Sequence, residues 1–144
     1  MKLAFKLIKQ KPDYFNVPVL HNLDANFRIK TSKTGMLKYY GTFSTTKVGF
    51  RYSDIDSAGM KDAFNLKNLN MYHNLSWREK IGLGWKMTAG FSYSTNKDNI
   101  HNEFQNENNQ KQSLADPLFA YKNFDVVTHG HYVNGKLVIE KRLK

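Results

Sequence analysis

The sequence predicts an all-β fold, an antiparallel up-and-down meander of about seven strands that forms part of a transmembrane β-barrel. Three observations predict it: polar and apolar residues alternate with period two, no useful window has the helical period, and short connections alternate with long ones. Successive connections of a meander lie at opposite ends of the sheet. One end therefore carries tight turns and the other long polar loops, as in outer-membrane barrels.

Each strand is predicted from a segment with period two. In 85–96 the odd positions are apolar, aromatic or threonine, and the even positions are polar or glycine. The segments 20–31 and 67–77 alternate in the same way, with asparagine prominent on the polar face. In chain order, the predicted strands cover 2–9, 20–31, 36–52, 67–77, 85–96, 124–133 and 136–142.

The connections divide into two classes. The short ones are "SKTG" (32–35), "REKIGLG" (78–84) and "NG" (134–135). Asn-Gly is the strongest two-residue signal for a hairpin. The long ones cover 10–19, 53–66 and 97–123.

Three aromatic residues lie beside the short connections. Trp77 and Trp85 flank one short connection, and Tyr39 lies just after another. Barrels place aromatic side chains at the two membrane interfaces. We therefore predict that Tyr39, Trp77 and Trp85 lie at the membrane interface on the short-turn side, with the apolar face against lipid.

Composition excludes several classes of function. The chain has a net charge of +10, but its lysines and arginines are spread along it and alternate with apolar residues. This distribution predicts no nucleic-acid partner. The absence of cysteine excludes disulfides and thiolate metal sites. In "MKLAFKLIKQK" the lysines interrupt any apolar stretch, so we expect no signal peptide there.

Two motifs have a spacing that is typical of metal-binding sites. Asp54, Asp56 and Gly59 match positions of a calcium-binding EF-hand loop, but Ala58 and Asn65 replace two of its ligands. His129 and His131 lie two residues apart on one side of a predicted strand, without a third ligand beside them. We predict no metal site and no cofactor.

The chain is not expected to be an enzyme, because it has no nucleophile elbow, phosphate-binding glycine loop or HExxH motif. Recognition is instead expected in the loops, which vary at little cost to a fold. The segment 97–123 offers amides for hydrogen bonds and aromatic rings for stacking. The predicted ligand-binding residues, on an extracellular loop, are Asn102, Phe104, Asn106, Phe119 and Tyr121.

Three stretches together resemble a known family. They are "QKPDYFNVPVLHNLDANFRIKTSKTGMLKYYGTFS", "DIDSAGMKDAFNLKNLNMYHNLSW" and "GWKMTAGFSYSTNKDNI". Nearly the whole chain resembles the barrel domain of TonB-dependent outer-membrane receptors of the Bacteroidetes type. The resemblance implies a barrel of about 22 strands filled by an N-terminal plug. It also implies import of a scarce nutrient, such as an iron chelate, a vitamin or a glycan.

The sequence departs from that family in having no TonB box, no plug and too few strands. Residues 1–144 are therefore expected to be part of a receptor barrel in the cell outer membrane, not competent for transport alone. The expected partners are outer-membrane lipid, the rest of the receptor, and TonB through the missing plug.

Two alternatives stay open. One is a soluble basic β-sandwich or small barrel that binds a ligand or a polyanion. The other is a cell-surface adhesion segment that acts through 53–66 and 97–123.

Overall fold

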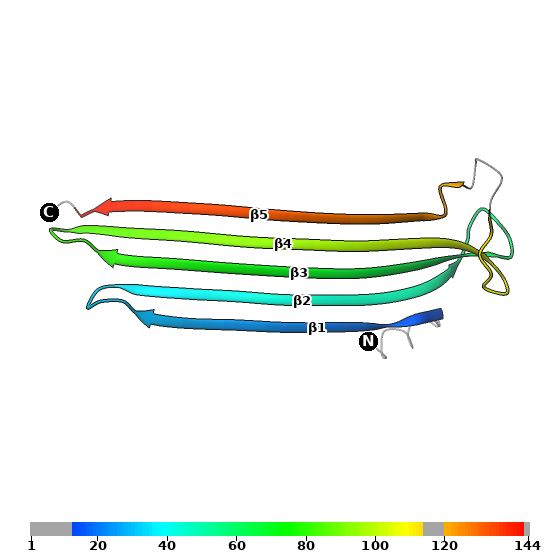
Figure 1. Cartoon of the computed structure of the whole chain (residues 1–144), viewed down its shortest axis with the longest axis horizontal. Coiled ribbons are helices and arrows are strands. Elements are labelled where there is room, and N and C mark those ends of the chain that lie inside the picture. Colours follow the sequence, from blue (N-terminus) through cyan, green and yellow to red (C-terminus); the bar gives the residue numbers. More distant parts are fainter. Residues whose placement is uncertain (1–12, 114–119, 143–144) are drawn as a thin grey trace. The chain divides into compact units, whose positions relative to one another are not determined.

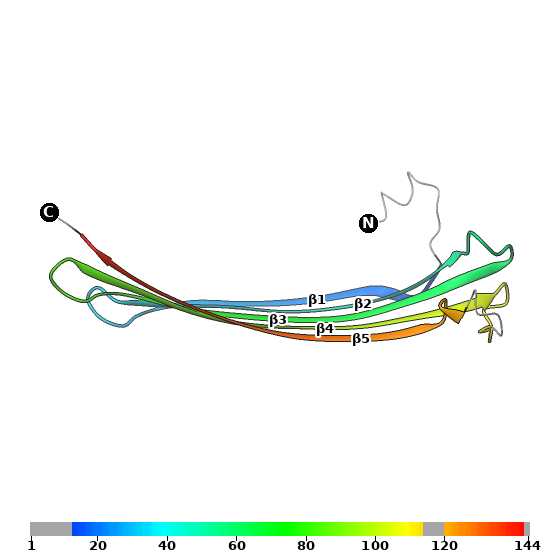
Figure 2. The same cartoon turned by 90° about the horizontal axis from the view of Figure 1, so that it is seen from above.

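The structure is a computed structural model that describes residues 13–113 and 120–142. They form one antiparallel sheet with the strand order β1-β2-β3-β4-β5 (Figure 1). The strands are Asp13–Lys30 (β1), Met36–Ser53 (β2), Met60–Lys80 (β3), Trp85–Asn106 (β4) and Phe124–Lys141 (β5). The sheet is not closed, and β1 and β5 are its edge strands (Figure 2). Within these two described ranges, no helix is long and apolar enough to cross a membrane.

The predicted all-β meander is confirmed, but the prediction of about seven strands is wrong for the described residues, which form five. The strand predicted at 2–9 lies outside the described residues. Two segments predicted as separate strands, 124–133 and 136–142, form the single strand β5. Asn134 and Gly135 lie inside that strand and make no turn. Pairing with β4 on both sides of this dipeptide outweighs its local preference for a hairpin.

The predicted long connections are also shorter than expected. Much of 10–19 belongs to β1, 60–66 opens β3, and 97–106 closes β4. The connections that remain are 31–35, 54–59, 81–84 and 107–123. The polar ends of these strands were missed because period two reveals a strand only where one face is apolar.

The chain divides into two compact units, and each is described by itself. Unit 1 contains Thr46–Lys67, Asp98–Val127 and the described residues before His21. Unit 2 contains His21–Thr45, Asn68–Lys97 and the described residues from Thr128 onward. Unit 1 therefore holds both connections 54–59 and 107–123, and unit 2 holds the tight turns 31–35 and 81–84.

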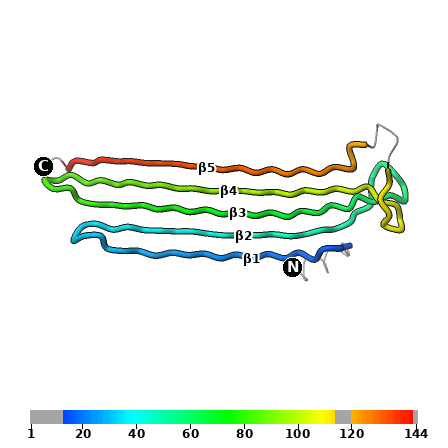
Figure 3. Tube along the Cα trace, in the orientation of Figure 1, coloured from blue at the N-terminus to red at the C-terminus, as the bar shows by residue number. Residues whose placement is uncertain are grey.

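The two tight turns of unit 2 are built differently. The turn 81–84 uses left-handed backbone, with φ of +81° at both Gly82 and Gly84. The turn 31–35, traced in Figure 3 between β1 and β2, closes with a hydrogen bond from Thr31 N to Gly35 O.

The turn 31–35 is also fixed by a residue of β3. The Glu79 carboxylate accepts hydrogen bonds from the hydroxyls of Ser32 at 2.5 Å and Thr34 at 2.9 Å. The Trp77 indole donates to Thr31 Oγ1 at 3.2 Å. We call these contacts the Glu79 clamp; they connect β1's turn to β3, a strand that is not β1's neighbour in the sheet.

Candidate functional site

The sheet of unit 2 has one apolar face. Side chains alternate between the faces of a strand, so odd positions share one face in each strand here. The ring pairs Phe27–Tyr39 and Tyr93–His131 join odd positions of neighbouring strands and confirm this register. Most odd positions of these segments carry apolar or aromatic side chains: 23–29 in β1, 37–43 in β2, 69–77 in β3, 85–93 in β4 and 133–139 in β5. We call this surface the apolar face.

The apolar face is exposed. Phe91 is 53% exposed, Leu137 64% and Leu23 69%. Among the described residues, the only buried hydrophobic side chains are Ala63 and Phe104, and both belong to unit 1. In the part of the chain that the structure describes, the apolar face of unit 2 is therefore not covered by a second layer.

A row of rings crosses the apolar face, with one ring from each strand. It consists of Phe27, Tyr39, His73, Tyr93 and His131, with ring centroids 4.8 to 6.5 Å apart. Two pairs of polar atoms in the row are in contact: Tyr39 Oη lies 2.7 Å from His73 Nδ1, and Tyr93 Oη lies 2.8 Å from His131 Nδ1. These contacts pair both tyrosine hydroxyls and one nitrogen of each histidine ring, which reduces the number of unpaired polar groups on an otherwise apolar surface.

The opposite face of unit 2 carries the even positions and is polar. Its neutral residues are mainly asparagine, serine and threonine. Tyr40 Oη donates to Asp24 at 3.3 Å, and Lys86 pairs with Glu140 at 2.7 Å. Cations outnumber anions on this face, where the basic side chains are Arg28, Lys30, Lys38, Arg78, Lys80, Lys86, Lys136 and Arg142. We call this surface the polar face.

Unit 1 contains a buried ionic cluster. The Lys122 ammonium contacts the Asp54 carboxylate, and their side chains are only 7% and 4% exposed. The Asn102 amide joins the cluster by donating to Asp62 at 2.9 Å and to the Lys122 carbonyl at 2.7 Å. The cluster ties the connection 54–59 to the segment that precedes β5.

The charges of this cluster depend on one another. Burial alone would raise the pKa of Asp54, but hydrogen bonds from Lys122 and from the Asp56 backbone outweigh burial and lower it. Burial raises the pKa of Asp62, and the nearby Asp54 carboxylate adds to this rise. Burial would lower the pKa of Lys122, but the bond to Asp54 and the charge of Asp62 raise it instead. Lys122 thus supplies the positive charge that these carboxylates need.

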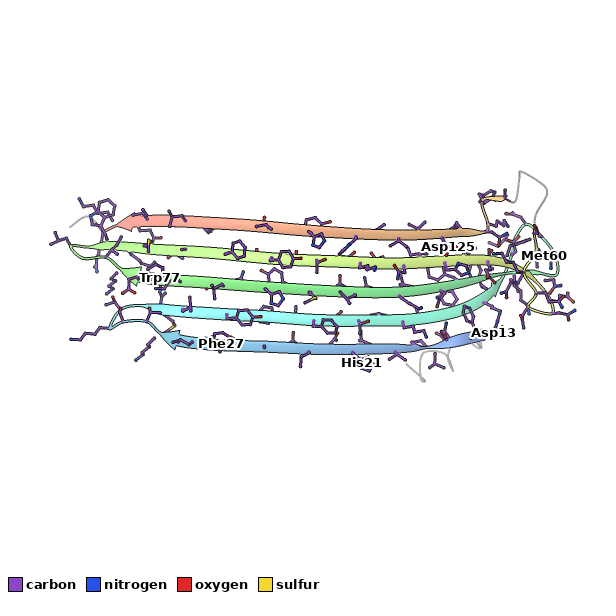
Figure 4. The ribbon with its side chains drawn as sticks, in the orientation of Figure 1. Asp13, His21, Phe27, Met60, Trp77 and Asp125 are labelled. Carbon is purple, nitrogen blue, oxygen red and sulfur yellow. The ribbon has the colours of Figure 1, made fainter. Side chains whose placement is uncertain are left out.

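A second polar network crosses the odd positions of unit 1. His101 Nδ1 lies 2.5 Å from Asp125, and its Nε2 lies 3.1 Å from Glu103. Gln105 donates to Glu103 at 3.0 Å and accepts from Arg51 at 2.9 Å. With a carboxylate at each ring nitrogen, His101 is bound best as the imidazolium. Figure 4 labels Asp125, the β5 member of the network.

His101 gives unit 1 a predicted dependence on pH. The hydrogen bond to Asp125, and a weaker one to Glu103, raise the pKa of His101 above its ordinary value of 6.5. The stabilisation is therefore complete below pH 6.5 and is lost as the pH rises through the raised pKa. We expect the difference in melting temperature between the parent chain and His101→Gln to be largest at acidic pH and to vanish at alkaline pH. A difference that grows with pH would contradict this assignment.

The predicted ligand-binding residues do not lie together on a loop. Asn102, Phe104 and Asn106 belong to β4, so their placement in a loop is wrong. Phe104 is only 2% exposed, and the Asn102 amide is used within the ionic cluster. Tyr121 is 66% exposed in the connection before β5, and Phe119 lies outside the described residues. A ligand role for these residues stays a prediction, although the burial of Phe104 does not favour stacking.

The predicted interface aromatics all belong to unit 2, on the apolar face. Tyr39 is part of the row of rings, Trp77 belongs to the Glu79 clamp, and Lys141 Nζ lies 5.1 Å above the Trp85 ring. Figure 4 labels Trp77 on β3 and Phe27 on β1. Their contact with a membrane interface stays a prediction.

The two motifs with metal-binding spacing have protein partners. Lys122 lies against Asp54 and 3.9 Å from Asp56. His129 and His131 bind Thr95 and Tyr93, respectively. Within 13–113 and 120–142, no group of three or more metal-ligating side chains is brought together.

Sequence reasoning missed the residues that organise unit 1, namely Asp62, His101, Gln105 and Lys122. The only sequence signal was the pair Asp54 and Asp56, whose spacing suggests calcium binding and not pairing with an internal lysine.

Comparison of the chain with protein-family models, with curated proteins and with solved structures finds no match.

Proposed function

We propose that this chain is a segment of the barrel domain of an outer-membrane TonB-dependent receptor that imports a scarce nutrient. On this proposal, the apolar face of unit 2 contacts outer-membrane lipid and the polar face lines the wet interior. A plug domain elsewhere in the receptor couples it to TonB.

The observation that carries the proposal is the two-faced sheet of unit 2. Its apolar runs, such as 69–77 and 85–93, approach the roughly nine to eleven residues with which a strand crosses a bilayer. The other three strands contribute shorter segments, 23–29, 37–43 and 133–139, to the same apolar face. Alternation of apolar outside and polar inside positions is the signature of transmembrane barrel strands.

The open sheet favours a segment of a larger barrel. β1 and β5 each have one edge without a strand partner among the described residues. Lipid offers no hydrogen bonds to such edges, so a membrane sheet must close, and the smallest bacterial barrels need about eight strands. Further strands must therefore complete the barrel. The alternative soluble sandwich would need a second sheet over the apolar face, and the described residues supply none.

Contact with lipid is tested by placing a single tryptophan on each face. Trp77 and Trp85 are the only tryptophans. In a Trp77→Phe/Trp85→Phe background, Phe91→Trp and Tyr132→Trp place the probe on the apolar and polar faces, at sites of similar exposure, 53% and 59%. We expect lipids brominated on their acyl chains to quench the fluorescence of Phe91→Trp strongly and that of Tyr132→Trp weakly.

Quenching of neither probe, with the chain in vesicles, would contradict contact with lipid. Equal quenching of both would contradict a wet interior. The unquenched Tyr132→Trp chain is the matched control, because it shares the background and differs in the face that carries the probe.

Membership of a larger receptor is tested in source cells. An antibody against 107–123 is expected to detect a band several times heavier than 16.8 kDa in the outer-membrane fraction. A band of 16.8 kDa in the soluble fraction would contradict the receptor proposal.

A further inference from the structure

The polar face of unit 2 is hollowed in its middle. The hollow has a volume of about 310 Å³, which is near the lower end of small-molecule sites. Four strands line it, with Thr42 and Ser44 from β2, Asn70 and Tyr72 from β3, Asn96 from β4 and Tyr132 from β5.

The side chains of the hollow are uncharged. Among the described residues, every one that lines it is neutral, although the polar face around it carries several lysines and arginines. A charged ligand would lose hydration in the hollow without gaining an opposite charge. A neutral ligand with several hydroxyls would instead exchange hydrogen bonds to water for hydrogen bonds to amides and hydroxyls.

A chain of amides fixes the orientation of the hydrogen-bonding groups. Asn96 Nδ2 donates to Asn70 Oδ1 at 2.6 Å, and Asn70 Nδ2 donates to Asn68 Oδ1. Tyr72 Oη accepts from Asn74 at 2.8 Å, which leaves the Tyr72 hydroxyl hydrogen to donate elsewhere. Within the described part of the chain, the hydroxyls of Thr42 and Ser44 have no hydrogen-bond partner. The hollow thus combines oriented amides with hydroxyls that are not engaged.

An aromatic ring borders the hollow and lies against the sheet. A Cβ atom at Gly130 would lie 2.9 Å from Tyr132 Oη, so glycine at this position makes room for the ring. Tyr132 is 59% exposed, which leaves a ring face open beside the amides. An open aromatic face next to hydrogen-bonding groups suits a ligand with an apolar side and a polar edge.

We propose that this hollow binds a neutral saccharide, with Tyr132 stacking on the apolar side of a sugar ring and Asn70 and Asn96 hydrogen-bonding its hydroxyls. The inference rests on the proposed function, because it takes the polar face as the interior through which the nutrient passes. It identifies that nutrient as a glycan and not as an anionic iron chelate.

The test uses the complete receptor that contains this chain, purified in detergent micelles, with maltotriose and cellotriose as neutral probes and ferric citrate as the charged one. Side-chain amide resonances of Asn70 and Asn96 report on binding. We expect saturable shifts with at least one sugar and none with ferric citrate. Tyr132→Ala is expected to weaken sugar binding about tenfold. Asn96→Ala is expected to weaken sugar binding as well, measured through the Asn70 resonance. Tyr52→Ala, at an exposed tyrosine of unit 1 outside the hollow, is the control.

Three results would overturn the inference: no shift with either sugar, equal shifts with ferric citrate, or sugar binding that Tyr132→Ala and Asn96→Ala leave unchanged. Failure of this inference is distinguishable from failure of the proposed function. Lipid quenching of Phe91→Trp without sugar binding would leave the membrane barrel standing and remove only the saccharide.

Discussion

Phe91→Arg is expected to abolish assembly of the chain in a membrane, whereas Ser92→Arg is expected to be tolerated. The two residues are neighbours in β4, but Phe91 lies on the apolar face and Ser92 on the polar face. An arginine in the lipid-facing middle of a barrel strand costs roughly 2–4 kcal/mol, while interior positions accept charge readily. The polar face already carries arginines and lysines on every strand.

The measurement is the amount of polypeptide recovered in the outer-membrane fraction, detected with the antibody against 107–123. The expected loss for Phe91→Arg corresponds to roughly 30-fold or more in the folding equilibrium. Phe91→Leu is a further control, because it changes the shape of the side chain but keeps the surface apolar. Recovery of Phe91→Arg at the parent level would contradict the assignment of the apolar face to lipid.

Lys122→Met is expected to release the connection 54–59 from the rest of unit 1. Methionine retains an apolar stem but removes the ammonium that contacts Asp54. The carboxylates of Asp54 and Asp62 then stay close together without a cation. Removing one partner of a buried ion pair typically costs about 3–5 kcal/mol.

Hydrogen exchange at two amides measures this release. Asp54 N donates to Met60 O, and Met60 N donates to Ser57 O, so both amides report on the connection 54–59. We expect exchange at both to accelerate roughly a hundredfold. Lys111→Met is the matched control, because the Lys111 side chain is 55% exposed and lies 4.0 Å from its nearest carboxylate.

A compensating substitution tests whether charge is the cause. Adding Asp54→Asn to Lys122→Met removes one of the two uncompensated carboxylates and is expected to restore part of the protection. If the double variant exchanges as fast as Lys122→Met, the loss comes from packing around Lys122 and not from charge.

The fold of unit 2 was predictable because one of its faces is apolar. In 85–93 the alternation determines both the strand and the face that each side chain occupies. The sequence did not reveal that 97–106 continues the same strand, because there one face is wholly polar and the other mixes Ile100 and Phe104 with polar residues. The polar side chains of this segment form hydrogen bonds with residues of neighbouring strands. His101 contacts Asp125 of β5, and Asn102 donates to Asp62 of β3. Such pairings join residues far apart in sequence, and period two cannot detect them.

The inability of period two to detect pairing between distant residues also explains why the predicted ligand-binding residues were placed in a loop. Asn102 and Phe104 were placed in a loop because their segment is rich in asparagine, a residue that favours turns. In β4 the Asn102 amide and the Phe104 ring are buried. The hollow on the polar face is formed by side chains from four strands, so strand register was needed before it was visible.

The Glu79 clamp has a consequence for the order in which the strands assemble. Chain order would let the hairpin of β1 and β2 form first, because its contacts are local. Its turn, however, takes three hydroxyl-to-carboxylate contacts from Glu79, which lies 45 to 48 residues further along the chain. A hairpin made of β1 and β2 alone therefore has a turn whose hydroxyls lack their final acceptor. The hydroxyls gain this acceptor only when β3 docks, so the clamp couples completion of the turn between β1 and β2 to the docking of β3.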